Sequence, residues 1–430
     1  YDALAMFRNV QSHEGLSAQG VLAYEPALAS DALQGGARYW DAATNDTRLT
    51  LATVLGAQAE GATVANHVSV TGALRSDHGR MVGAVVRDEL TRREFEVRAH
   101  AVINATGPWS DQTAALTGES AGHQVLGSAG THIAVPRDRV GNHDAITIVS
   151  PLDGRVMFVL PAGPNTIIGT TERPTMSSPD EIRATEGDVA YLLASVNRLF
   201  PQASLTRDDV VSAWCGIRPL AVVRLGEHSA NSASREHAIA HRGDGLVSVT
   251  GGKLTTYRAM AKDVVKHAVR ELAIAGVLPS TVTATSRPGT PSLPGGAFTS
   301  REALMEEARA ATRDQSVGEH LSQAYGTDWR VVWQRAQGEG DLSQPVVRGL
   351  PYIMAEVLHA VHDELACTLS DVLIRRTHIA FETRDNGRSA ARRIAPLMGT
   401  ALGWSAEQQQ QALIEYDADA TRIFSVDPEE

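Results

Sequence analysis

A strand, a double glycine and a helix follow one another between residues 245 and 272, and this unit limits the fold more than any other feature of the sequence. Residues 245–250 form a short apolar run, which predicts a buried strand. Gly251 and Gly252 break that pattern, and apolar residues then recur every three or four positions from Leu254 to Leu272. This spacing predicts an amphipathic helix directly after the turn, and hence a fold that combines strands with helices.

Two earlier stretches are rich in short strands. Between residues 66 and 106, three β-branched runs predict a small meander, and a fourth, nearly all-apolar run predicts a buried parallel strand: 68–71, 81–86, 93–97 and 101–105. A second group has the roughly ten-residue spacing of an antiparallel sheet: 132–135, 145–149, 156–160 and 166–169. Helices are predicted over 47–60 and 181–200.

The last third of the chain is predicted to be helical. Residues 279–298 are rich in Pro, Ser, Thr and Gly, which indicates a linker. Helices are expected over 300–312, 351–367, 385–402 and 405–421, the first with Ser300 as its N-cap. Because 430 residues exceed what one core holds, two or three subdomains are expected.

Charge and cysteine content narrow the class of protein. The chain has 39 basic and 50 acidic residues, a net charge of −11, so nucleic acid is not an expected partner and any bound anion requires a local cluster of Arg and Lys. Cys215 and Cys367 form no metal-binding pattern, which indicates a reducing compartment. The sequence contains no run of about 18 apolar residues, so no membrane span is predicted. The chain starts at Tyr1 with residues that are typical of the middle of a helix, so we expect an N-terminal truncation.

The start of the helix after Gly252 is the first candidate binding site. The first amides of a helix lack partners within it, and the helix dipole favours negative charge there. A Walker phosphate loop is excluded because Val247 and Leu254 stand where that motif requires Gly and Ser or Thr. A plain glycine turn beside a solvated Lys253 remains the alternative interpretation.

Two arginines and a small-residue turn are further candidates. Arg218 precedes Pro219, which favours an extended backbone, and its apolar neighbours suggest a strand end that faces a cavity. Arg235 lies shortly after it; a guanidinium suits phosphate or carboxylate, although either arginine alone is more often a surface residue. Thr106 and Gly107 follow a predicted strand, where α/β sheets place nucleotides, but a simple strand exit is the alternative.

Other catalytic motifs are weak or missing. Glu356, His359 and His362 share a predicted helix face with metal-ligand spacing, but a second Glu-x-x-His copy is missing, so a solvated face is the favoured interpretation and no metal is expected. No HExxH or GxGxxG occurs, which disfavours zinc proteases and a complete dinucleotide fingerprint.

Taken together, several segments resemble the FAD-dependent glycerol-3-phosphate dehydrogenases of bacteria and mitochondria. The most specific are Asn104-Ala105-Thr106-Gly107-Pro108-Trp109, Thr131-His132-Ile133, Gly216-Ile217-Arg218-Pro219-Leu220, Ser234-Arg235-Glu236-His237, Gly251-Gly252-Lys253-Leu254-Thr255-Thr256-Tyr257-Arg258 and, near the end, the run from Glu364 to Thr377. The resemblance covers nearly the whole chain in order.

The resemblance implies a glutathione-reductase-like FAD fold of the α/β class with an antiparallel β cap and an all-helical C-terminal domain. We expect the FAD-binding domain over 1–130, the substrate cap over 131–244, a return strand and helix over 245–278, a linker over 279–298 and the helical domain over 299–430. The family's N-terminal strand and GxGxxG turn are missing here. If these residues are the entire polypeptide, weak or absent FAD binding is expected.

The resemblance also implies roles for individual residues. Arg218, Arg235 and Lys253 match residues directed at the substrate, and Arg218 and Lys253 are the expected catalytic pair. The expected FAD contacts are Val70, Thr106, Gly107, Gly252, Lys253, Leu254 and Thr255. The general base is not identified.

The expected reaction is the oxidation of sn-glycerol 3-phosphate to dihydroxyacetone phosphate, with electrons passed to quinone. An oxygen-using oxidase, an amine-oxidising relative and an inactive interaction module are the alternatives. A cytoplasmic location is expected, with peripheral contact to the inner face of the membrane and a homodimer among the arrangements considered.

Overall fold

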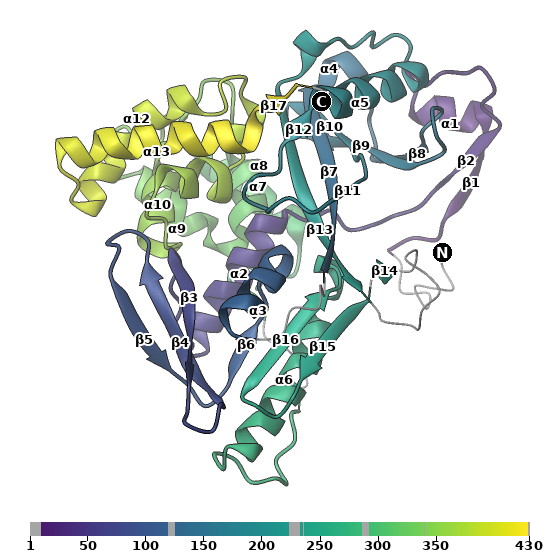
Figure 1. The fold of residues 1–430 in the computed structure, drawn as a ribbon. Helices are drawn as coiled ribbons and strands as arrows, with labels where there is room; N and C mark the ends of the chain where they lie inside the picture. Colours follow the sequence, from purple (N-terminus) through teal and green to yellow (C-terminus); the bar gives the residue numbers. More distant parts are fainter. Residues whose placement is uncertain are drawn as a thin grey trace.

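The computed structural model describes residues 10–118, 125–222, 233–234, 236–285, 292–338 and 340–428. Figure 1 shows a large sheet on one side, the C-terminal helices on the other, and two small sheets below them. The expected N-terminal helical stretch at residues 1–7 lies outside the described residues.

The two small sheets contain the predicted meander and the strand that leads into the double glycine. Strands β3 (Val68–Arg75), β4 (Met81–Asp88) and β5 (Glu94–Arg98) form the predicted antiparallel meander, after helix α2 (Asp46–Ala59). Strands β6 (Val102–Asn104), β15 (His237–His241) and β16 (Leu246–Gly251) form the second sheet, in the order β15-β16-β6, and β6 pairs with β16 in parallel as predicted. The 3-10 turn η3 (Leu254–Thr256) and helix α6 (Tyr257–Ile274) follow β16.

The prediction that the run 101–105 is buried was wrong in part. Ile103 is 45% exposed, although Asn104 is buried. The physical reason is that β6 is the edge strand of its sheet among the described residues, so strand pairing covers it on one side only.

The large sheet contains the second group of predicted strands. Its members are β7 (Val125–Pro136), β8 (Ile146–Val149), β9 (Val156–Ala162), β10 (Asn165–Gly169), β11 (Arg173–Thr175), β13 (Ser212–Val222) and β14 (Ala233–Ser234). The order is β14-β13-β7-β10-β9-β8, with β11 on β7, and all pairs are antiparallel. Ile133, Met157 and Ile168 on one face pack against Leu192 of helix α5 (Glu186–Leu199).

Helix α5 begins five residues later than predicted, because its N-cap is Thr185. The Thr185 hydroxyl accepts from the amide of Asp188 at 3.1 Å, and the Asp188 carboxylate accepts from the amide of Thr185 at 3.3 Å. This reciprocal cap satisfies two amides at the helix start.

Short elements connect these layers. They are β1 (Glu14–Ser17), α1 (Ala18–Tyr24), β2 (Gly35–Arg38), the 3-10 turn η1 (Gly107–Trp109), α3 (Ser110–Leu116), α4 (Arg137–Val140), β12 (Ala184–Thr185), the 3-10 turn η2 (Arg207–Asp209) and β17 (Val426–Asp427). Strand β17 pairs with β12 in parallel and so attaches the end of the described chain to the large-sheet region.

The C-terminal region is helical, as predicted. It comprises α7 (Arg301–Thr312), α8 (Gln315–Tyr325), the 3-10 turn η4 (Gly326–Asp328), α9 (Trp329–Ala336), α10 (Met354–Asp363), the π-helix η5 (Asp371–Arg376), α11 (Ile379–Glu382), α12 (Arg388–Leu402) and α13 (Ala406–Phe424). Ser300 caps α7 by accepting from the amide of Ala303 at 3.1 Å, as expected. Helices α8 and α9 were not predicted, and α10 is shorter than the predicted helix over 351–367.

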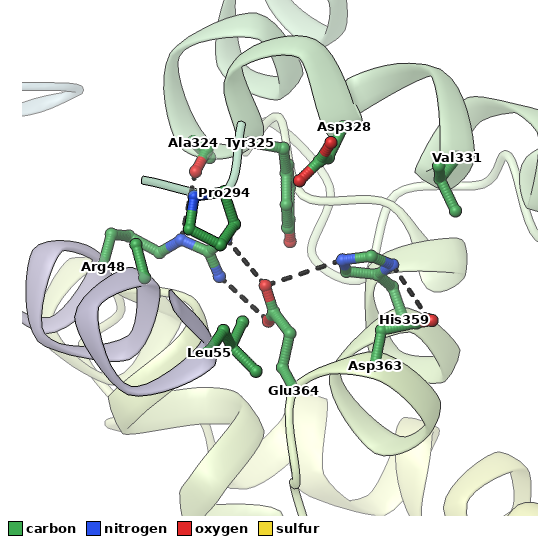
Figure 2. Close-up of a pocket in the computed structure, with 11 residues that line it drawn as sticks. Arg48, Leu55, Pro294, Ala324, Tyr325, Asp328, Val331, His359, Asp363 and Glu364 are labelled. Carbon is green, nitrogen blue, oxygen red and sulfur yellow. Dashed lines mark hydrogen bonds and ion pairs between the residues drawn. The ribbon is translucent and has the colours of Figure 1, made fainter. Parts of the chain in front are cut away.

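The solvated helix face expected on α10 was wrong for two of its three residues. Glu356 is 1% exposed and His359 is 6% exposed, whereas His362 is exposed. Glu356 accepts from Tyr325 at 2.9 Å and lies 2.7 Å from Nε2 of His320. Figure 2 shows His359 between the carboxylates of Asp363 and Glu364. The structure therefore uses these polar side chains in a buried network that links helices.

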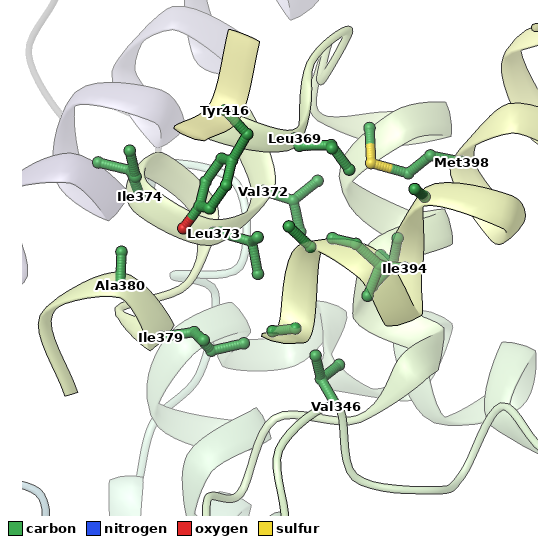
Figure 3. Packing of buried hydrophobic residues seen from close by; sticks show 14 of the residues in the cluster. Val346, Leu369, Val372, Leu373, Ile374, Ile379, Ala380, Ile394, Met398 and Tyr416 are labelled. Atoms are coloured by element: carbon green, nitrogen blue, oxygen red, sulfur yellow. The ribbon is translucent and has the colours of Figure 1, made fainter. Parts of the chain in front are cut away.

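Apolar residues from five C-terminal elements form a second core beside this network (Figure 3). Leu373 of η5, Ile379 of α11 and Ile394 of α12 are fully buried. Tyr416 of α13 packs there and donates its hydroxyl to the carbonyl of Asn386 at 2.6 Å.

Three further expectations meet the structure as follows. The domain boundaries remain a prediction; β7 crosses the one at 130/131. Both cysteines are free thiols. Within the part of the chain that the structure describes, no helix combines the length and apolarity needed to cross a bilayer.

We predict that Leu192→Ala destabilises the large-sheet region by about 2–5 kcal/mol, because this fully buried side chain leaves a cavity under the sheet. Urea unfolding followed by circular dichroism measures the change. Met176→Ala is the control, since Met176 is 73% exposed and its loss is expected to change stability by less than about 0.5 kcal/mol. Equal effects for the two variants would contradict the assigned core.

Candidate active site

The double glycine forms the expected turn between β16 and the helix. Gly251 and Gly252 have φ values of 73° and 82°, a left-handed conformation that side chains rarely adopt. A Cβ atom on Gly252 would lie 2.4 Å from Sδ of Met260. Glycine is therefore required at position 252 both by the backbone conformation and by the close approach of helix α6.

The residues after the turn face outward. Lys253, Leu254 and Thr255 are exposed, with Leu254 at 40%. The backbone amide of Lys253 donates to the hydroxyl of Thr256 at 3.3 Å. A helix start with exposed residues and positive dipole character offers a place for an electron-rich group, so these positions fit the flavin contacts expected from the sequence.

The turn at Thr106 and Gly107 lies at the matching end of β6. Because β6 and β16 are parallel, both turns leave the sheet at the same edge. Buried Asn104 accepts from the Thr106 hydroxyl at 2.7 Å, and its side-chain nitrogen donates to the carbonyl of Ser110 at 3.3 Å. Thr106 itself is exposed, and Gly107 has a φ of 57°. The turn is thus rigidly held with an open outer surface.

Val70 lies on the neighbouring meander. It pairs with Val86 across β3 and β4 and is 38% exposed. Helix α3, which follows η1, contacts β3. Val70 therefore belongs to the same side of the molecule as the turn at Thr106.

Arg218 lies within β13 and not at a strand end, which corrects the sequence-based expectation. The strand continues because β7 pairs with it on both sides of Arg218. Nη2 of Arg218 donates to the hydroxyl of Thr170 at 2.8 Å, while Nη1 is buried and has no hydrogen-bond partner among the described residues. A Cβ atom on Gly130 would lie 2.6 Å from Nη1, so the guanidinium occupies space that only glycine leaves free.

His132 is a site residue that the sequence analysis did not single out. Across the sheet it pairs with Trp214 of β13 and with Gly169 of β10. Its ring stacks on Trp214 with centroids 5.7 Å apart, and a Cβ atom on Gly169 would lie 2.2 Å from the imidazole. Gly130 and Gly169 were the available sign in the sequence that space is left for a large side chain. Which residue fills that space is known only from the pairing of the strands.

Burial, together with the charge of Arg218, lowers the pKa of His132 from 6.5 to about 4. The imidazole is therefore uncharged at neutral pH. A neutral imidazole beside a guanidinium with a free buried donor can accept a proton while the guanidinium stabilises an anion.

The structure brings most of the predicted residues to one region. Strand β13, which carries Arg218, contacts both β16 and η1, and these elements lead to Lys253 and Gly107. Arg235 lies outside the described residues. In the described part of the chain, no group of three or more His, Cys, Asp or Glu side chains is arranged to hold a metal ion.

We predict that His132 makes stability depend on pH. Unfolded His132 binds a proton near pH 6.5 and folded His132 near pH 4, so the unfolded chain binds more protons in this window and stability rises with pH across it. Between pH 7.5 and 4.5, the free energy of unfolding should fall by about 2–3 kcal/mol more in wild type than in His132→Gln. Urea unfolding at both pH values measures this, and equal losses would contradict the buried neutral imidazole.

Comparisons with known proteins agree with this geometry. Residues 2–258 match the family described as FAD dependent oxidoreductase, and residues 289–409 match the C-terminal domain of alpha-glycerophosphate oxidase. The chain is 34% identical over 422 residues to glycerol-3-phosphate dehydrogenase 2 of Mycobacterium tuberculosis, covering 97% of this chain and 70% of that protein. It is also 34% identical over 423 residues to the mitochondrial glycerol-3-phosphate dehydrogenase of Homo sapiens, covering 96% of this chain and 57% of that protein.

A solved structure extends the comparison to the fold. The glycerol-3-phosphate dehydrogenase of Bacillus halodurans, complexed with FAD, superposes with a TM-score of 0.77 at 26% identity and covers 95% of this chain and 79% of that chain. This match confirms the predicted FAD-binding fold with a helical C-terminal domain. Sequence identity over nearly the whole chain, together with the matching family model, shows that the chain belongs to the FAD-dependent glycerol-3-phosphate dehydrogenase family.

Proposed function

We propose that this protein oxidises C2 of sn-glycerol 3-phosphate to the ketone of dihydroxyacetone phosphate and passes the electrons to a quinone. The observation that carries the proposal is the guanidinium of Arg218, whose buried Nη1 has no hydrogen-bond partner within the described parts of the chain and lies beside the neutral imidazole of His132. A buried donor without an acceptor is costly, and a phosphate or an alkoxide oxygen would satisfy it.

The residues of the proposed site have separate roles in the reaction. FAD, when bound, supplies the two-electron acceptor for the hydride that leaves C2. The proton of the C2 hydroxyl group must leave as the ketone forms, and His132 suits this role because its imidazole is uncharged at neutral pH. Arg218 stabilises the negative charge on the substrate, through either its phosphate or the reacting oxygen.

The turns at Gly107 and Gly252 form the cofactor side of the proposed site. The helix start at the exposed residues Lys253, Leu254 and Thr255 suits the end of the flavin where negative charge develops, and Lys253 adds a positive charge there. Thr106 and Val70 suit the dinucleotide part. Arg235 is retained as a substrate contact on the resemblance alone.

Exposed apolar side chains support a lipid-soluble acceptor. Val149 and Val156 face each other on β8 and β9 and are 61% and 52% exposed. Phe158, which is 40% exposed, pairs with Gly169, which in turn pairs with His132. Because side chains alternate along strands, this apolar row lies on the same face of the sheet as His132. We therefore propose a quinone as acceptor, with peripheral attachment to the cytoplasmic face of the membrane. A homodimer remains a further prediction.

Molecular oxygen is the second candidate acceptor. It is favoured by the match of residues 289–409 to a domain named after alpha-glycerophosphate oxidase. Oxygen consumption measured against quinone reduction, with the same substrate and protein, decides between the two acceptors.

We predict that Arg218→Met raises the KM for glycerol 3-phosphate about 10- to 100-fold, because a charge-assisted contact worth about 1.5–3 kcal/mol is lost. Gly130→Ala should act in the same direction, since its methyl group displaces the guanidinium. Arg207→Met is the control, because Arg207 pairs with Glu186 on the opposite side of the sheet. Steady-state kinetics and bound-flavin absorbance are measured for each variant. Unchanged kinetics in Arg218→Met would remove this residue from the site.

We predict that Val149→Ser with Val156→Ser lowers quinone reduction roughly 5- to 30-fold, because apolar contact area with the acceptor is lost. Reduction of water-soluble ferricyanide should not change, since the substrate side is untouched. Val265→Ser on α6, at a 48% exposed position, is the matched control. An equal fall with both acceptors would contradict the proposed docking surface.

A further inference from the structure

Two buried carboxylates on one C-terminal segment bind basic side chains from the first 70 residues of the chain. Glu364 pairs with Arg48 of α2, and Asp371 pairs with His67, the residue directly before β3. Both carboxylates are almost fully buried, with side-chain exposures of 2% and 3%. The segment from Glu364 to Arg376 therefore connects the helical region to the region of the proposed FAD contacts.

The first contact is a bidentate ion pair. Nη1 and Nη2 of Arg48 lie 2.9 and 2.7 Å from the two oxygens of Glu364. Nε of Arg48 donates to the carbonyl of Ala324 at 3.1 Å, and its guanidinium lies 4.4 Å from the ring centre of Tyr325. All three nitrogens of the guanidinium therefore contact the C-terminal region. Figure 2 shows the contacts with Glu364 and Ala324.

A cavity of about 210 Å³ lies beside this pair, lined in addition by Asp328 and Asp363. Loss of Arg48 would leave Glu364 without its bidentate partner in a cavity that two more carboxylates line. Helix α2 has no fully buried residue, so this ion pair is a specific contact that fixes its position, and removal of one partner would leave a buried charge uncompensated.

The second contact holds the start of β3. Oδ2 of Asp371 lies 2.7 Å from Nε2 of His67 and also accepts from the amides of Cys367 and Thr368 at 2.9 and 3.0 Å. His67 has a φ of 53°, in the left-handed region, and its carbonyl accepts from the amide of Glu89 at 2.8 Å. Asp371 therefore fixes the residue at which β3 begins and at which its pairing with β4 ends.

The two contacts belong to one unit. Nε of Arg376 donates to the carbonyl of Glu364 at 3.2 Å, and its Nη1 lies 3.4 Å from Oδ1 of Asp371. Burial opposes ionisation of Glu364, but the hydrogen bond with His359 and the charge of Arg48 lower its pKa to about 2. Burial likewise opposes ionisation of Asp371, and its hydrogen bond with His67 holds its pKa well below the usual value. Both carboxylates therefore stay charged at neutral pH.

We propose that Glu364 and Asp371 are positioning residues for the cofactor side of the active site: they hold helix α2 and the start of strand β3 in place from the C-terminal domain. Val70 stands three positions after His67 on β3, so a shift of His67 moves a proposed FAD contact. The part of this inference that concerns FAD rests on the proposed function. The part that concerns α2 and β3 does not.

Hydrogen–deuterium exchange of the full-length chain tests the structural part. Asp371→Asn should raise exchange in residues 68–75 at least tenfold, and Glu364→Gln should do the same in residues 46–59. Neither should change exchange in α5, which is remote from both contacts. Glu319→Gln is the matched control, because its pair with Arg309 joins α7 to α8 at 2.6 Å within the C-terminal region. Unchanged exchange in both target segments, or a uniform rise over the whole chain, would overturn the proposal.

FAD affinity, measured by flavin fluorescence on titration of the chain with FAD, tests the functional part. Asp371→Asn and His67→Asn should each weaken FAD binding about tenfold, and the double variant should be no weaker than either single variant, because one shared contact is lost. Asn at position 67 tolerates the left-handed backbone, so the comparison isolates the imidazole. Wild-type affinity in both single variants would overturn the positioning role. If wild type itself does not bind FAD, the proposed function fails, and the exchange experiment still decides whether the two carboxylates hold α2 and β3.

Discussion

The alternation of side chains along β7 is the constraint on which the rest of the proposed site depends. Ile133 and Val135 point into the core beneath α5, so Gly130 and His132 must point to the opposite face of the sheet. The hydroxyl of Thr131, on the core side, donates to Asp188 at 2.8 Å and ties the strand to the start of α5. A slip of one residue would bury the imidazole in the core and expose the isoleucine, so the register is strongly specified.

Two glycines on this face of the sheet leave room for the side chains of the proposed site. Gly130 leaves room for the guanidinium of Arg218, and Gly169 leaves room for the ring of His132. Burial, together with the nearby charge of Arg218, lowers the pKa of His132, so the imidazole is neutral beside a cationic guanidinium. This pairing of an anion-stabilising group with a neutral proton acceptor is what an alcohol oxidation requires from the protein.

The helical C-terminal region is held to α2 and β3 by charged contacts, while its own interior is held by apolar packing. Its own core is apolar and centred on Leu373 and Ile394, but it meets α2 and β3 through the carboxylates of Glu364 and Asp371. Such contacts are directional, because a bidentate pair or a hydrogen-bonded imidazole has one favourable geometry. They are therefore suited to holding two regions in a defined relation.

The sequence by itself determined the local elements and the family. The double glycine at 251 and 252, the cap at Ser300 and the helix that follows each of them are read from neighbours within a few residues, and the structure agrees with them. Tertiary structure alone decided the burial of Glu356 and His359, the exposure of Ile103, the place of Arg218 inside a strand, and the meeting of His132 with Gly169 and Trp214. The reason is that these features depend on strand registers and helix contacts between residues tens to hundreds of positions apart, and no local pattern of residues encodes which distant partner will cover a side chain.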